Sequence, residues 1–121
     1  MGQGILLGNG GGTKYELNKE VFTGDYWVDG APIYMRTFYK KNLKNTEIIF
    51  DGTNDIGQLI NYFGKATDNG EGIIIPYSDA GDIRLHAYIR NIQGKITFYK
   101  YHIEPTDIYI TIFYTKSGGG N

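Results

Sequence analysis

The chain contains no cysteine, and it contains only two histidines and two serines. The absence of cysteine excludes disulfides, thiol chemistry and a zinc site built on thiolates. Ser78 lies in a turn and Ser117 lies in the tail, so neither has the strand-to-helix setting of a nucleophile elbow. The sequence therefore gives no support to nucleophilic catalysis.

Residues that favour helices, such as Ala, Leu, Met and Gln, are also few, whereas Ile, Tyr, Thr and Phe are abundant. This bias predicts an all-β fold, and 121 residues are enough for one domain. The 12 basic and 13 acidic residues leave a net charge of −1, which argues against broad binding to nucleic acid. No apolar run approaches the ~18 residues of a membrane span, and the start lacks a signal-peptide pattern, so we expect no membrane insertion.

Glycine is abundant, with 18 residues, and several lie near the two ends. We expect residues 1–19 to be a flexible lead or attachment segment, residues 20–116 to be the folded domain, and residues 117–121 to be a flexible tail. The lead has one apolar patch, Ile5-Leu6-Leu7, which either packs on a neighbouring subunit or is an expression remnant. The glycine run 8–12 lacks the Lys-Ser/Thr pair and the helix of a phosphate loop.

The stretch from Glu20 to Lys40 predicts a β-hairpin. Asp-Gly between two aromatic and β-branched runs is typical of a two-residue type I′ turn, because Gly adopts positive φ freely. The residues that we expect to define this hairpin are Trp27, Asp29, Gly30, Pro32 and Tyr34.

Further short strands are predicted at 47–50, 73–77, 82–90, 95–101 and 108–115. The segment 59–65 fits either a helix or a strand, and its Tyr, Ile and Phe content favours a strand. Pro76 cannot donate to a ladder, which places it at a sheet edge or a strand end. Seven to eight short strands with turns about every ten residues predict an antiparallel, jelly-roll-like β-sandwich.

The last strand is apolar or aromatic on both faces. An isoleucine row, 108, 110 and 112, lies on one face, with Tyr109 and Phe113 on the other. Since a strand buried on one face only shows a polar second face, this pattern indicates contact with another subunit through Tyr109 and Phe113. The alternative is a solvent-exposed surface of residues with good β propensity.

Tyrosine is more abundant than a core of this size needs, with 11 residues. Tyrosines on a sheet serve as stacking platforms for sugars and as anchors of protein interfaces, or as cross-strand pairs that stabilise the sheet itself. Tyr99, Tyr101 and His102, near a loop end, are our candidate ligand-binding residues. Proteins that bind oligonucleotides by base stacking usually have a basic groove, which a net charge of −1 does not indicate.

The two histidines offer little to a metal ion. His86 is typical of a hydrogen-bonded surface residue, and His102 with Glu104 provides two ligands, which are too few for a zinc site. Acidic pairs such as Asp79 and Asp82 are typical of turns, and no calcium loop of EF-hand spacing occurs. We expect no metal site, no cofactor and no enzymatic activity.

The run Trp27-Val28-Asp29-Gly30-Ala31-Pro32-Ile33-Tyr34 resembles the W-x-D-G-K-P-[IL]-Y-x-K signature of phage and prophage tail, baseplate and head-fibre structural proteins of Gram-positive hosts. Two later elements are similar to that family as well, the Ile74-Ile75-Pro76 segment and the closing strand from Tyr109 to Lys116. The resemblance covers roughly residues 20–116. The chain departs from the family pattern at Ala31, where Lys is frequent, and at Met35-Arg36.

The resemblance implies a non-enzymatic virion structural protein, a fibre, baseplate or capsid-surface module that forms a homotrimer. It implies other virion proteins and a host cell-surface glycan as partners, and assembly in the host cytoplasm followed by release on lysis. It carries over no receptor-site residues. The alternative function is a carbohydrate-binding module that uses a surface aromatic platform.

Overall fold

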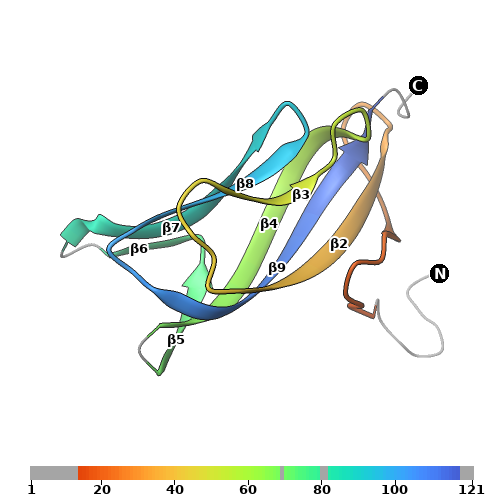
Figure 1. Ribbon diagram of the computed structural model, residues 1–121. Helices are drawn as coiled ribbons and strands as arrows, with labels where there is room; N and C mark the ends of the chain where they lie inside the picture. Colours follow the sequence, from red (N-terminus) through yellow and green to blue (C-terminus); the bar gives the residue numbers. More distant parts are fainter. Residues whose placement is uncertain (1–13, 69, 80–81, 118–121) are drawn as a thin grey trace.

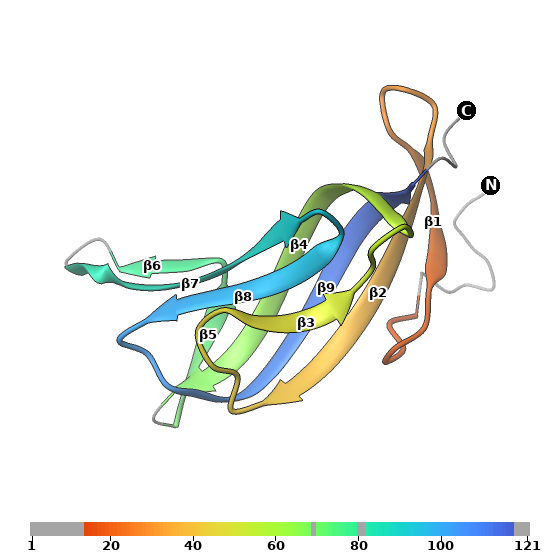
Figure 2. The same ribbon diagram turned by 45° about the horizontal axis from the view of Figure 1, so that its top comes forward.

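The computed structural model describes residues 14–68, 70–79 and 82–117, and these residues form nine strands and no helix. The Ile5-Leu6-Leu7 patch and the end of the tail lie outside the described residues. The strands pack in two layers (Figure 1, Figure 2). In chain order they are β1 (Val21–Tyr26), β2 (Pro32–Lys41), β3 (Glu47–Asp51), β4 (Ile56–Asp68), β5 (Glu71–Ile75), β6 (Tyr77–Asp79), β7 (Asp82–Ile92), β8 (Lys95–Tyr101) and β9 (Pro105–Lys116).

One sheet has the strand order β1-β2-β9-β4-β5, and the other has the order β3-β8-β7-β6. Each named pair of neighbouring strands is antiparallel. The chain crosses between the sheets after β2, after β3, after β5 and after β8, which are connections of the jelly-roll kind. The expected all-β, antiparallel, jelly-roll-like sandwich is confirmed.

Pro76 accounts for the strand beyond the expected seven or eight. The segment 73–77, expected to be one strand ended by proline, belongs to two strands, because β5 ends at Ile75 and β6 begins at Tyr77. These two strands lie in different sheets, each at the edge of its own sheet. The expected position of Pro76 at a strand end is confirmed, and the single strand was wrong.

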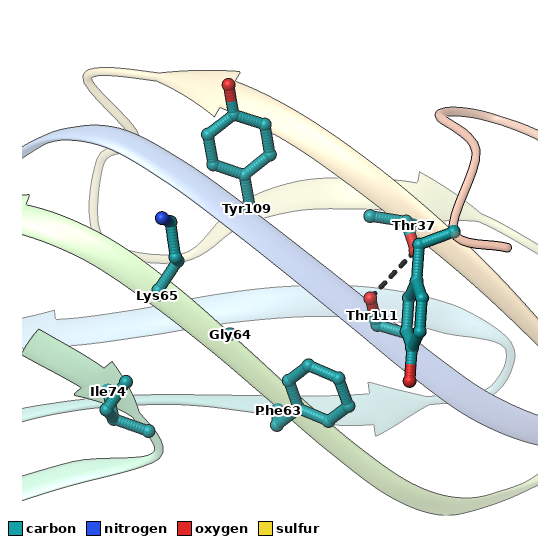
Figure 3. Close-up of a pocket in the computed structure, with 8 residues that line it drawn as sticks. Thr37, Phe63, Gly64, Lys65, Ile74, Tyr109 and Thr111 are labelled. Carbon is teal, nitrogen blue, oxygen red and sulfur yellow. Dashed lines mark hydrogen bonds between the residues drawn. The ribbon is translucent and has the colours of Figure 1, made fainter. Parts of the chain in front are cut away.

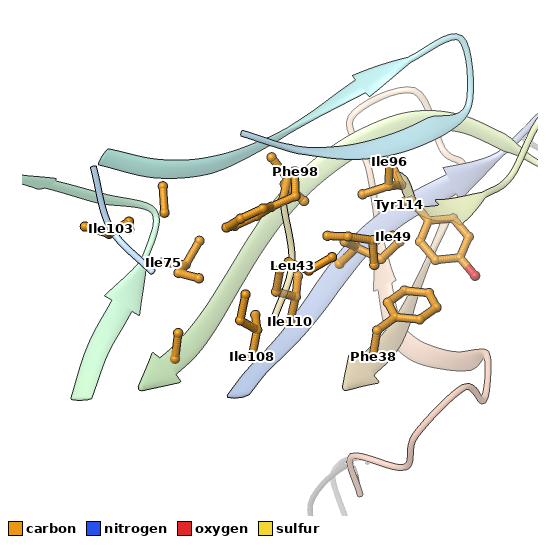
Figure 4. Close-up of a cluster of buried hydrophobic side chains, with 14 of the residues drawn as sticks. Phe38, Leu43, Ile49, Ile75, Ile96, Phe98, Ile103, Ile108, Ile110 and Tyr114 are labelled. Carbon is orange, nitrogen blue, oxygen red and sulfur yellow. The ribbon is translucent and has the colours of Figure 1, made fainter. Parts of the chain in front are cut away.

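The core lies between the two sheets (Figure 4). The inner face of β9 contributes four side chains that are at most 1% exposed, those of Ile108, Ile110, Ile112 and Tyr114. Ile96 and Phe98 of β8 face them from the other sheet and are fully buried. Burying a side chain of this size stabilises the fold by roughly 1.5–3 kcal/mol, so these two strands contribute a large share of the core.

The ambiguous segment 59–65 is a strand, and β4 extends beyond it on both sides. Gly64 lies in the middle of β4, between Ile75 of β5 and Ile110 of β9. A Cβ atom at Gly64 would lie 2.6 Å from the carbonyl oxygen of Tyr109. The close approach of two backbones therefore requires glycine at this position.

The β1–β2 hairpin forms as expected, but its turn is not of type I′. The amide of Gly30 donates to the carbonyl oxygen of Trp27, the amide of Trp27 donates to the carbonyl oxygen of Ala31, and Gly30 has φ +89° while Asp29 keeps a negative φ. This is a three-residue loop, in which a turn is followed by a glycine in the left-handed region. The Asp29 carboxylate accepts a hydrogen bond from the Ala31 amide at 2.9 Å instead of entering the left-handed region.

The turn of type I′ geometry lies between β7 and β8. Gln93 and Gly94 have φ values of +53° and +90°, and they connect the paired residues Ile92 and Lys95. A two-residue turn sets the register of the whole hairpin. It therefore determines which side chains of β7 and β8 are neighbours.

Candidate binding surfaces on the two sheets

The outer face of the five-stranded sheet, which points away from the core, carries side chains in rows across the strands. Thr37, Thr111 and Phe63 form one row, and the next row contains Tyr39, Tyr109, Lys65 and Ile74. The ring centroids of Tyr39 and Tyr109 lie 4.9 Å apart, and the Tyr39 hydroxyl donates a hydrogen bond to Asp107. The sequence analysis expected aromatic residues on the second face of the last strand. In the sheet, the strands beside β9 add further apolar side chains to this face.

A hollow of about 510 Å³ lies over these rows (Figure 3), and we call it the outer-face hollow. Its lining consists of Tyr15, Thr37, Phe63, Gly64, Lys65, Ile74, Tyr109 and Thr111. A hollow of about 310 Å³ shares Lys65, Ile74 and Tyr109 with it and extends the concave surface toward Asp107.

The floor of the outer-face hollow is a hydroxyl pair. The Oγ1 atoms of Thr37 and Thr111 lie 2.7 Å apart, so one hydroxyl donates to the other. The Tyr15 ring, from the segment before β1, lies with its centroid 6.0 Å from that of Phe63. Tyr15 thus forms one wall of the hollow, which β2, β4, β5 and β9 otherwise build.

The two expected interface residues lie on this face but in different hollows. Tyr109 lines the outer-face hollow and is 42% exposed. Phe113 packs against Phe63, with ring centroids 5.9 Å apart, and lines a smaller hollow of about 200 Å³ next to Asn61. Sequence reasoning missed Phe63, Lys65 and Ile74, because only strand pairing places β4 and β5 beside β9.

The outer face of the four-stranded sheet carries an aromatic ladder, which we define as His86, Tyr88, Tyr99 and Tyr101. Tyr88 and Tyr99 stack with centroids 5.3 Å apart and ring planes 12° apart. His86 and Tyr101 stack at 5.9 Å and 21°. The ladder consists of two cross-strand pairs, one above the other, on β7 and β8.

The structure brings all three expected ligand-binding residues to this ladder. Tyr99 and Tyr101 belong to it, and the His102 ring lies edge-on to Tyr101 with centroids 4.1 Å apart. The guanidinium of Arg90 lies 5.9 Å from the centroid of Tyr99, within cation–π range. Their partners His86 and Tyr88 were not among the candidates, although the Gln93-Gly94 turn pairs them with Tyr101 and Tyr99.

The loop of the β1–β2 hairpin is a third exposed apolar element. Val28 is 90% exposed at its tip, beside the exposed Tyr26 and the partly exposed Trp27. Of the residues expected to define the hairpin, Pro32 pairs with Tyr26, and Tyr34 turns inward against Tyr114, with ring centroids 6.3 Å apart. Trp27 is not a core residue.

A charged cluster closes one end of the sandwich. The Glu20 carboxylate accepts hydrogen bonds from the Tyr114 hydroxyl at 2.6 Å and from the Lys116 ammonium at 3.0 Å, and a guanidinium nitrogen of Arg36 lies 3.7 Å away. Partial burial tends to raise the pKa of Glu20, but these partners together outweigh it, so the pKa lies below its ordinary value of 4.5. Burial and the hydrogen bond to Glu20 raise the pKa of Tyr114.

The described residues include no group of three or more His, Asp or Glu side chains placed to hold a metal ion. Glu104, which the sequence analysis considered with His102 as a potential metal ligand, forms an ion pair with Lys100 at 3.0 Å. None of the described residues lies in a helix that is long and apolar enough to span a membrane.

Comparison of the chain with protein-family models, with curated proteins and with solved structures finds no match. The family resemblance carried by the Trp27–Tyr34 run therefore stays a prediction. The geometry offers two candidate binding surfaces, the outer-face hollow with its rim and the aromatic ladder.

Proposed function

We propose that this protein is a non-enzymatic structural module of a virion, carried on a fibre, a baseplate or the capsid surface. In this proposal it assembles with copies of itself, as a homotrimer, and with other virion proteins. The resemblance of the Trp27–Tyr34 run to phage and prophage structural proteins supports the virion setting. The observation that carries the self-association is the apolar outer face of the five-stranded sheet.

Three neighbouring strands leave large apolar side chains exposed on this face. Phe63 on β4 is 43% exposed, and in the sheet order it lies between Tyr109 on β9, 42% exposed, and Ile74 on β5, 66% exposed. Contiguous apolar patches mark interaction sites, and aromatic residues are enriched at the centres of protein interfaces. A second copy of the chain that covers Tyr109 and Phe113 would remove this surface from water.

The test is the solution mass of the purified chain, measured by light scattering at several concentrations. We expect a stable species near three times 13.6 kDa. A monomer at every concentration would contradict the self-association.

The Tyr109→Lys variant places a charge at the centre of the proposed interface and should shift the mass toward the monomer. Ile48→Lys is the matched control, because Ile48 is a similarly exposed apolar residue on β3, in the other sheet. Equal effects of the two substitutions would point to general destabilisation rather than to this interface.

The aromatic ladder favours a second function, the binding of a host cell-surface glycan. Tyrosine and histidine rings offer flat apolar surfaces to a sugar, with Arg90 and His102 beside them as hydrogen-bond donors. The ladder and the outer-face hollow lie on opposite sides of the sandwich, so the two functions do not compete for one surface.

The Tyr99→Ala and Tyr101→Ala variants separate the two functions. If the ladder binds glycan, binding to host cells or to an array of glycans falls while the solution mass stays unchanged. Tyr26→Ala, which removes an exposed tyrosine from the hairpin tip, is the control and should leave binding intact. Unchanged binding in both ladder variants would exclude the ladder as the glycan site.

A further inference from the structure

The outer-face hollow has an apolar lining and few polar groups with which to orient a small ligand. The hydroxyls of Thr37 and Thr111 bond to each other, while Phe63 and Ile74 present only carbon. Pockets for small molecules combine an apolar lining with a few convergent polar groups, and they measure about 300–1,000 Å³. Lys65, Tyr15 and Tyr109 also line the hollow of about 510 Å³, but most of the surface that it presents is carbon, which suits several aliphatic side chains.

The segment before β1 already lies on this face. Leu17 forms a bridge with Thr37, the Asn18 amide donates to the carbonyl oxygen of Thr37 at 2.8 Å, and Tyr15 lines the hollow itself. The described chain therefore begins at the wall of the hollow. Thirteen residues precede Lys14, and their one apolar run is Ile5-Leu6-Leu7.

We infer that the Ile5-Leu6-Leu7 patch binds in the outer-face hollow of its own chain. Leu6 lies nine residues before Tyr15, so an extended chain separates the two by at most roughly 32 Å. The glycines among residues 8–12 permit the chain to reverse direction. A short tether also gives the patch a high effective concentration at its own hollow, above that of a patch on another molecule.

This inference goes beyond the proposed function and stands without it. Filling the hollow would cover part of the face proposed for contact between copies, Phe63, Ile74 and Tyr109 included, and would leave Tyr39 and Phe113, which do not line it, for that contact. A protein that is monomeric in solution would contradict the proposed self-association and leave the binding of Ile5-Leu6-Leu7 unaffected.

Introduced cysteines test the inference directly, because the chain has none of its own. In the variant with Leu6→Cys and Ile74→Cys, we expect an intrachain disulfide to form in a glutathione redox buffer. The equilibrium with glutathione measures the effective concentration of the two introduced thiols relative to each other. The matched control carries the same two cysteines together with Ile5→Ser and Leu7→Ser. It keeps the tether and removes the apolar side chains.

If the patch binds in the hollow, the effective concentration falls about tenfold in the serine control. A decrease smaller than threefold would overturn the inference, because the tether alone would then account for the disulfide. A disulfide between chains, seen as a dimer on a non-reducing gel, would also overturn it, since the hollow would then take a neighbour's patch.

A second measurement uses a variant that changes none of the residues lining the hollow. NMR spectra of the wild-type chain and of the Ile5→Ser, Leu7→Ser double variant should differ at the methyl groups of Ile74 and Thr111 and at the ring of Phe63. The signals of Ile48 and Ile92, in the other sheet, serve as controls. Unchanged signals at all three hollow residues would overturn the inference even if the cysteine variants fail to fold.

Discussion

The hydroxyl groups of Thr37 and Thr111 form a hydrogen bond of 2.7 Å across β2 and β9, and both side chains are almost completely buried. They lie on the outer face of the sheet, where a two-layer sandwich would expose its residues to solvent. Tyr15 and Leu17 from the segment before β1 cover this part of the face. The pair therefore marks a small second buried region outside the main core.

The threonine pair predicts non-additive stability. Thr37→Val or Thr111→Val alone leaves one buried hydroxyl unpaired and should lower the free energy of unfolding by about 1–3 kcal/mol. The double variant removes both hydroxyls and should cost less than the sum of the two. A double-mutant cycle in urea measures the difference, and additive effects would show that the bond does not couple the residues.

Glu20 predicts a loss of stability in acid. The pKa of Glu20 is lowered in the folded state, so its carboxylate stabilises the fold fully above the unfolded value of 4.5. This contribution is lost as the pH falls through the folded pKa. The free energy of unfolding from urea titrations should therefore decrease as the pH falls below about 5, and less steeply in Glu20→Gln.

Glu16→Gln is the control for this acid prediction. Glu16 forms an exposed ion pair with Lys19 at 3.4 Å, and such pairs contribute only about 0–1 kcal/mol. The pH profile of Glu16→Gln should follow that of the wild type. If Glu20→Gln has the wild-type profile as well, the charged cluster is not what confers the acid sensitivity.

Gly64 predicts a strong steric effect. The Cβ atom of Gly64→Ala would lie 2.6 Å from the Tyr109 carbonyl oxygen, so β4 and β9 must move apart. We expect a loss of about 1–3 kcal/mol in the free energy of unfolding, as for other overpacked sites. Gly72→Ala is the control, because a Cβ atom at Gly72 meets no atom within 4 Å. Similar losses at both glycines would contradict the steric explanation.

The two hairpin turns predict different responses to asparagine. Gln93 has φ +53° in a type I′ turn, which asparagine adopts more readily than glutamine, so Gln93→Asn should raise stability by about 0.4–1 kcal/mol. Asp29 has a negative φ and accepts a hydrogen bond, which asparagine also does, so Asp29→Asn should leave stability nearly unchanged. Thermal unfolding compares the two variants, and a gain at Asp29 alone would contradict the turn assignment.

Alternation of apolar residues predicted much of the fold. The isoleucine row of β9 and the Ile96–Phe98 pair of β8 are buried as that alternation indicates, because successive side chains of a strand point to opposite faces. The same rule placed Tyr109 and Phe113 on the second face. The virion assignment, the trimer and the glycan stay predictions.

The aromatic ladder could have been found by a closer reading of the sequence. A two-residue Gln93-Gly94 turn pairs Tyr88 with Tyr99 and His86 with Tyr101, so the ladder follows from the turn and the strand period alone. The turn at Asp29-Gly30 could not be assigned in this way, because Asp-Gly also fits a three-residue loop and the hydrogen bond from Ala31 to Asp29 favours that loop.

Local sequence patterns predict most of the strands, their buried faces and the position of Pro76 at a strand end, because these depend on neighbours one or two residues away. Three features became visible in the folded chain alone: Pro76 separates two sheets, β4 and β5 extend the apolar face of β9, and Glu20 accepts a hydrogen bond from Tyr114. The pairing of strands distant in the chain depends on how the two sheets bury their inner faces together. The spacing of residues along the chain therefore does not predict which distant strands pair.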